Sequence, residues 1–131
     1  RLGVYLKEVT TVTEKMMDVL RVLCPLMLKC GAKLETGPRA CVHGREIAMG
    51  DVCPYTVAAS GARGVCRVCF HISIDGELYA AVTPWRIIRF DDKLAKCQVM
   101  NDAELIRTSD LGAPCIHSAN MQVGKIATVL I

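Results

Sequence analysis

The middle of the chain reads VCRVCFHISI (residues 65–74), then Asp75-Gly76, then ELYAAVTPWRIIRF (residues 77–90). An Asp-Gly pair between two apolar runs predicts a β-hairpin, because a type I′ turn needs positive φ at both central positions. Alternate residues of a strand point to opposite sides. The first strand is therefore expected to have a core face of Cys66, Val68, Phe70, Ile72 and Ile74, and a polar face of Arg67, Cys69, His71 and Ser73.

The composition is that of an ordinary globular protein. The chain has 131 residues, of which 52% are hydrophobic and 22% charged, so it can bury a core and is not disordered. No uncharged apolar run is long enough to span a membrane. The sequence begins at Arg1 without Met and ends on the apolar KIATVLI. We therefore expect a single domain over residues 1–131, excised from a longer chain.

The charge balance favours a protein partner over nucleic acid. Sixteen basic and thirteen acidic residues give a net charge of +3, which is too even to indicate a nucleic-acid surface. One Trp, three Tyr and two Phe also offer few stacking platforms for single strands. Nucleic-acid binding is kept as an alternative that is not favoured. The sequence carries no signal for an oligomeric state.

Eight cysteines allow two interpretations. In a secreted protein, an even number would indicate disulfides. However, Cys24 and Cys66 fall at core-facing positions of apolar segments, where a thiol acts as a small hydrophobic side chain. We therefore favour reduced thiols and a location in the cytoplasm or another reducing compartment.

One helix is expected near the N-terminus. Thr11 and Glu14 fit a capping box, and apolar residues recur at helical spacing from Val12 to Leu23. Pro25 should end or kink this helix, with a last turn before Gly31.

The rest of the chain predicts short strands joined by turns. Strands are expected over residues 1–8, 41–49, 55–58, 95–100 and 122–131, the last of them buried on both faces. Asn101-Asp102 is either a turn or the cap of a single helical turn over residues 103–107. Pro84 confines its part of the hairpin to an edge or a bulge. The predicted fold class is α+β: one N-terminal helix packed on a twisted antiparallel sheet or small open β-barrel of about six short strands.

Each of the three histidines follows a cysteine by two residues. Residues i and i+2 of a strand share a side, so two such pairs could form a Cys2His2 zinc site. The candidate ligands are Cys69, His71, Cys115 and His117. The competing interpretation is buried thiols beside surface imidazoles, with no cofactor. Cys66 and Cys69 form a C-x-x-C, but strand alternation places their sulfurs on opposite faces unless a bulge intervenes.

A thiol nucleophile is the other chemical alternative, with Cys30 or Cys115 as the candidate. Residues 30–50 (CGAKLETGPRACVHGREIAMG) resemble the end of the cysteine autoprotease of hepaciviruses, in which a nucleophilic Cys-Gly precedes a Pro and a Gly-Arg-Glu-Ile. This resemblance implies that Cys30 is the nucleophile. The family places its His upstream of that Cys, whereas residues 1–29 here contain no His.

A second local resemblance involves residues 109–114 (SDLGAP). They are similar to the active-site loop of chymotrypsin-like proteases, but Leu111 stands where the family has its serine. Together, the two resemblances imply a segment of an RNA-virus polyprotein. The domain would then belong to a viral nonstructural protein and act inside the host cell.

We expect a non-enzymatic domain that binds a protein partner through the surface of the central hairpin. Trp beside Arg is typical of binding hot spots. The predicted contact residues are Arg67, His71, Trp85 and Arg86. The alternatives are the cysteine hydrolase and the zinc-supported module.

Overall fold

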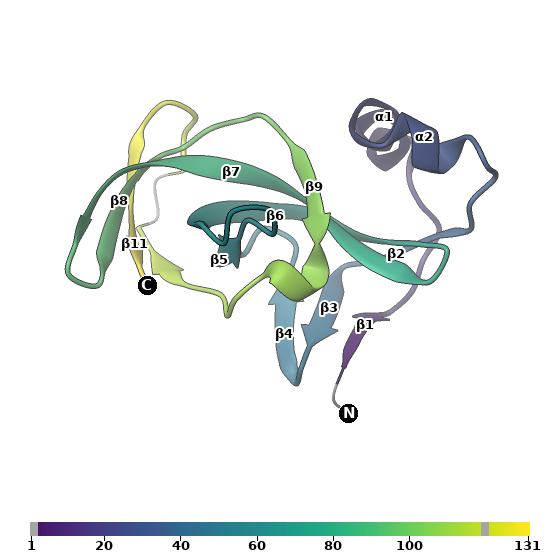
Figure 1. Cartoon of the computed structure of the whole chain (residues 1–131), viewed down its shortest axis with the longest axis horizontal. Helices are drawn as coiled ribbons and strands as arrows, with labels where there is room; N and C mark the ends of the chain where they lie inside the picture. Colours follow the sequence, from purple (N-terminus) through teal and green to yellow (C-terminus); the bar gives the residue numbers. More distant parts are fainter. Residues whose placement is uncertain (1–2, 119–120) are drawn as a thin grey trace.

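The predicted central hairpin is present and forms the middle of the molecule. The structure is a computed structural model that describes residues 3–118 and 121–131. Strands β6 (Arg63–Ile74) and β7 (Glu77–Asp91) pair antiparallel around Asp75 and Gly76, whose φ angles are 50° and 85°. The long β7 crosses much of the domain in Figure 1.

This hairpin belongs to the larger of two sheets. The larger has the order β10-β11-β8-β7-β6-β2, with β5 also paired to β6 and β9 to β7; the smaller has the order β1-β3-β4. The first strands are β1 (Val4–Lys7), β2 (Leu34–Gly37), β3 (Arg39–Val42), β4 (Arg45–Ala48) and β5 (Val52–Thr56). The later elements are β8 (Leu94–Gln98), β9 (Glu104–Arg107), the 3-10 helix η1 (Thr108–Asp110), β10 (Ile116–His117) and β11 (Ile126–Leu130).

The predicted α+β fold with one helix on about six short strands is wrong. The structure is mostly β, with 52% of residues in strands and 13% in helices. Residues 41–49 form the hairpin β3–β4 and not one strand, because His43 and Gly44 adopt φ angles of 50° and 87° and make a tight turn. Residues 103–107 hold strand β9, which pairs with β7, so the helical turn that was one alternative for this segment is absent.

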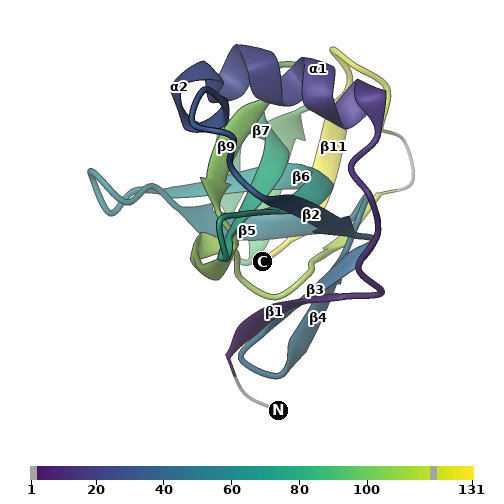
Figure 2. The same ribbon diagram turned by 90° about the vertical axis from the view of Figure 1, so that its right-hand side faces the viewer.

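The N-terminal helix is divided in two. Helix α1 spans Glu14–Leu23, and α2 spans Pro25–Leu28. Thr13, and not Thr11, is the N-cap, since its hydroxyl accepts a hydrogen bond from the amide of Met16 at 3.2 Å. Pro25 begins α2 because a proline is tolerated in the first turn but not in a helix interior. Both helices lie above the sheet in Figure 2.

A β-bulge overturns the predicted faces of β6. The register with β7 shifts between Val68 and Phe70, which leaves Cys69 as the extra residue. Side-chain alternation is therefore reversed along the strand: Cys66 and Val68 join one apolar cluster, whereas Phe70 joins another. His71, predicted on a polar surface, is fully buried.

Three apolar clusters make up the core. One lies between the small sheet and the hairpin and includes Val42, Ile47 and Val68; a second, around Trp85, lies against β8 and β11. The third packs Leu20 of α1 against Phe70. In the part of the chain that the structure describes, no helix has the length and apolar character needed to cross a membrane.

Candidate functional site

The four predicted binding residues do not form one surface. Arg67 and Arg86 are exposed, but Trp85 is only 4% exposed and His71 is completely buried. Arg86 pairs with Gln98 on the exposed side of the β7–β8 ladder, whereas Trp85 belongs to the core cluster on its other side. The expected single contact patch on the hairpin is therefore corrected: its residues are divided between two surfaces and the core.

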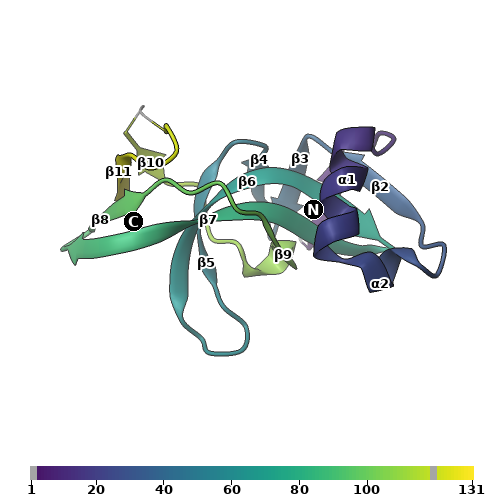
Figure 3. The same ribbon diagram turned by 90° about the horizontal axis from the view of Figure 1, so that it is seen from above.

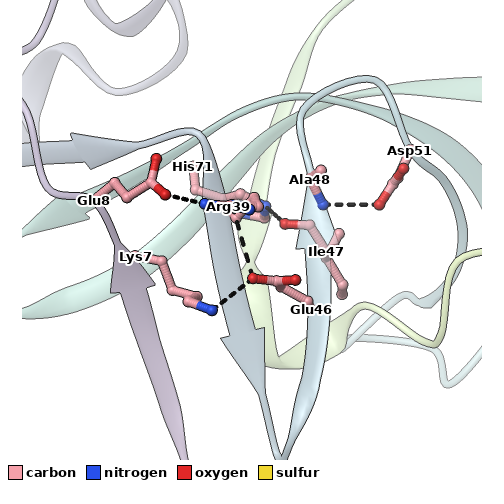
Figure 4. Close-up of polar contacts among 8 residues, drawn as sticks. All are labelled: Lys7, Glu8, Arg39, Glu46, Ile47, Ala48, Asp51 and His71. Carbon is pink, nitrogen blue, oxygen red and sulfur yellow. Dashed lines mark hydrogen bonds and ion pairs between the residues drawn. The ribbon is translucent and has the colours of Figure 1, made fainter.

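His71 links the two sheets from inside the protein. Its Nε2 lies 3.0 Å from the carbonyl oxygen of Ile47 on β4, as Figure 4 shows. Its Nδ1 is buried with no hydrogen-bond partner among the described residues. Burial lowers the pKa of His71 and outweighs the opposing influence of the Ile47 carbonyl and of Asp51. The ring is therefore a neutral structural link.

Several charged residues lie near His71 on the small sheet and in the turn after β4. Glu46 on β4 is 2.8 Å from Lys7 Nζ and 3.7 Å from Arg39 Nε, and Arg39 also contacts Glu8 (Figure 4). Asp51 accepts a hydrogen bond from the amide of Ala48 at 2.8 Å. These contacts join β1, β3 and β4 at the surface. Lys7, Glu8, Arg39 and Glu46 thereby neutralise one another.

The predicted residues Arg67, Cys69 and Trp85 do meet at a different feature, a cleft of about 390 Å³ beside the β6 bulge. We call it the bulge cleft. It lies between the bulge and the segments that follow β8 and precede β11. Three methionines that sequence reasoning did not single out also line it: Met49, Met100 and Met121.

Backbone hydrogen bonds place one wall of the bulge cleft. The amide of Gly50 donates to the carbonyl of Val68 at 2.8 Å, and the amide of Val68 donates to the carbonyl of Asp51 at 2.8 Å. These bonds hold the turn after β4, with Met49, against β6 just before the bulge. Cys69 Sγ lies 3.4 Å from Thr83 Oγ1 on β7, so the extra residue is anchored across the hairpin.

Trp85 and Arg67 add an aromatic ring and a positive charge to the lining of the bulge cleft. The Trp85 ring packs edge-on against His117, with centroids 6.5 Å apart at 89°, and its Nε1 is buried without a partner among the described residues. Arg67 is the charged side chain among the described lining residues. Its guanidinium makes no hydrogen bond or ion pair with any described residue and is open to a ligand.

The structure does not bring the four predicted zinc ligands together. Cys69 is hydrogen-bonded to Thr83 at the bulge, whereas His71 is hydrogen-bonded to the backbone of Ile47 in the core. His117 Nδ1 is 2.8 Å from the carbonyl of Ser118, and Cys115 packs against the cluster around Trp85. Across residues 3–118 and 121–131, no three Cys, His, Asp or Glu side chains are grouped as a metal would need. The C-x-x-C is also divided, since Cys66 is buried in the core.

The thiols are not arranged for nucleophilic catalysis. All eight cysteines are free, and no imidazole of the described residues is hydrogen-bonded to any of them. Cys30 is exposed after α2, and Cys115 is half-buried, which raises the pKa of its thiol and disfavours the thiolate. Leu111, in the protease-like loop, is a buried core residue next to η1.

The bulge cleft had only weak signals in the sequence. Met49 precedes Gly50 and Met100 precedes Asn101, so both methionines stand next to residues that are typical of turns. Nothing local in the sequence indicates that these two methionines and Met121 converge on the hairpin. Comparisons of this chain with models of protein families, with curated proteins and with solved structures found no match in any of the three.

Proposed function

We propose that this domain is a non-enzymatic binding module whose bulge cleft receives a segment of a partner protein. The occupant is an apolar side chain that enters between the methionines, next to an acidic residue that pairs with Arg67. The observation that carries the proposal is the combination of a methionine-lined cleft with an arginine in its lining that has no partner among the described residues.

The size and lining of the bulge cleft suit a side-chain anchor. Its volume of about 390 Å³ is near the lower end of the range of about 300–1,000 Å³ typical of small-molecule sites. Met49 is 44% exposed and Val123 is 61% exposed, so apolar surface is open to solvent there. Methionine is unbranched and polarizable, and it adapts to partners of different shape. An aliphatic or aromatic side chain would therefore contact the methionines, while a polar group beside it would meet the polar part of the lining.

The charge of Arg67 determines the second feature of the partner. A guanidinium can donate two parallel hydrogen bonds to one carboxylate, and arginine is enriched among residues that dominate binding energy. A basic partner would place like charge against Arg67. The preferred segment therefore carries Asp or Glu beside its apolar anchor.

The test is an array of twelve-residue peptides in which one apolar residue is flanked by Asp or Glu, together with matching peptides that carry Asn or Gln instead. We expect the wild-type domain to bind acidic members, and Arg67→Gln to weaken that binding by roughly tenfold or more, because a charge-assisted hydrogen bond is lost. Fluorescence anisotropy measures the affinities.

Arg63→Gln is the matched control, since Arg63 is also exposed on β6 but lies outside the bulge cleft. Its affinities should stay within about twofold of wild type. Equal weakening by both substitutions would overturn the proposal, as would an array with no peptide that binds. Circular dichroism verifies that both variants retain the wild-type fold.

A further inference from the structure

A second surface lies on the outer face of the sheet formed by β7, β8, β11 and β10. Cross-strand partners share a side of a sheet. Cys97 pairs with Ala127, and both are completely buried, which defines the inner side. The cross-strand rows on either side of the Cys97–Ala127 pair point to the opposite, outer side of the sheet. We call the residues of these outward rows the outer face. Figure 3 shows the helices over the opposite end of the sheet.

Aliphatic side chains occupy one half of the outer face. Leu94, Leu130 and Ile116 are consecutive partners across β8, β11 and β10. They are 39%, 42% and 75% exposed, and Ile126 in the same face is 52% exposed. The expectation that the last strand is buried on both faces is therefore wrong. Adjacent exposed aliphatic side chains form a contiguous apolar patch, which is typical of an interaction site, whereas single exposed residues are not.

Basic side chains occupy the other half of the outer face. Arg86 pairs with Gln98, and Arg89 pairs with Lys96, so the three bases lie on one side of β7 and β8. Arg86 has no ion pair among the described residues, and Lys96 Nζ donates to the hydroxyl of Thr128 at 2.7 Å. Asp91 lies 2.9 Å from Arg89 and compensates one charge. The half retains a net positive charge.

The arrangement of these two halves points to one kind of occupant. We propose that the outer face binds an amphipathic acidic helix of a partner protein. Its apolar face would cover Leu94, Leu130 and Ile116, and carboxylates along one flank would pair with Arg86 and Lys96. A helix is about 10 Å wide and strands are about 4.8 Å apart, so one helix spans both halves. The proposal uses no residue of the bulge cleft and does not depend on it.

Charge and geometry argue against two other occupants. A second copy of this chain would place its own basic half against the first one, or cover it with aliphatic side chains. A lipid surface would have to desolvate Gln98, which is the cross-strand partner of Ile126, and Thr128, whose row lies between those of Ile126 and Leu130. A helix lying on a sheet is an ordinary way to cover such a face, and α1 and α2 already cover the other part of this sheet.

The experiment uses a panel of eighteen-residue helical peptides with leucines at helical spacing and glutamates on one flank, paired with versions that carry lysines on that flank. Anisotropy measures affinity, and circular dichroism measures helix formation. We expect the glutamate peptides to bind as helices. The double variant Arg86→Glu/Arg89→Glu should lose at least tenfold affinity for them and gain affinity for the lysine peptides.

Two further variants make the result specific. Arg45→Glu/Arg63→Glu makes the same change in net charge at exposed positions outside the outer face and should preserve binding. Ile116→Asn removes an exposed aliphatic contact with little risk to the fold and should weaken binding severalfold. The proposal is overturned if no glutamate peptide binds, if the control weakens binding equally, or if anionic phosphatidylserine vesicles or self-association replace peptide binding.

Discussion

Replacing Leu20 by alanine should destabilise the domain by about 2–5 kcal/mol, because it removes a completely buried side chain and leaves a cavity. Leu20 is the one fully buried residue of α1, and it packs with Phe70 and Ile72 under the helices. Its loss should loosen both helices from the sheet. Guanidinium denaturation, followed by circular dichroism, measures the change in the free energy of unfolding.

Val22→Ala provides a control in the same helix. Val22 is 79% exposed, so its truncation removes little packing, and alanine has the higher helix propensity. We expect the free energy of unfolding to change by no more than about 0.5 kcal/mol. If both substitutions shift the denaturation midpoint equally, α1 is not attached to the sheet through Leu20.

His71 should make the domain less stable in acid. Its pKa in the folded protein lies below the ordinary value of 6.5, because burial disfavours the charged ring. The unfolded chain therefore binds a proton more readily than the folded one as the pH falls below about 6.5. The contribution of the neutral ring to the free energy of unfolding is fully present above that pH. It is lost progressively as the pH falls further, by up to about 1.4 kcal/mol per pH unit.

The measurement is the free energy of unfolding of wild type and His71→Gln between pH 5 and pH 8. A glutamine amide can still donate to the Ile47 carbonyl but does not titrate, so the slope below pH 6.5 should be flatter in this variant. His43→Gln is the matched control, since His43 is exposed in the β3–β4 turn. Equal slopes for wild type and His71→Gln would contradict the assignment.

Local sequence signals predicted the elements that depend on local physics. Asp75-Gly76 forms the expected turn, and Pro25 ends α1 as expected. The β3–β4 hairpin gave a weaker signal, since His43-Gly44 lacks the Asn or Asp that usually precedes the glycine of such a turn. What failed was the assumption that alternation continues unbroken through a strand. The bulge at Cys69 depends on how β7 pairs with β6, and a single strand does not reveal it.

The candidate site was only partly accessible to sequence reasoning for a related reason. Arg67 was correctly expected at the surface of the hairpin, and it is exposed. Trp85 and His71 are buried because neighbouring strands cover them, which periodicity cannot foresee. The three methionines of the bulge cleft come from connecting segments far apart in the chain, so tertiary structure alone brings them together.

The central hairpin also has a consequence for cooperativity. Residues of β6 and β7 contribute to all three apolar clusters, for example Val68, Trp85 and Phe70. Neither end of the molecule can melt without exposing apolar surface of the strands that support the other end. We therefore expect a single two-state transition. Fluorescence of the one tryptophan and helical circular dichroism report on opposite ends, and their denaturation curves should coincide.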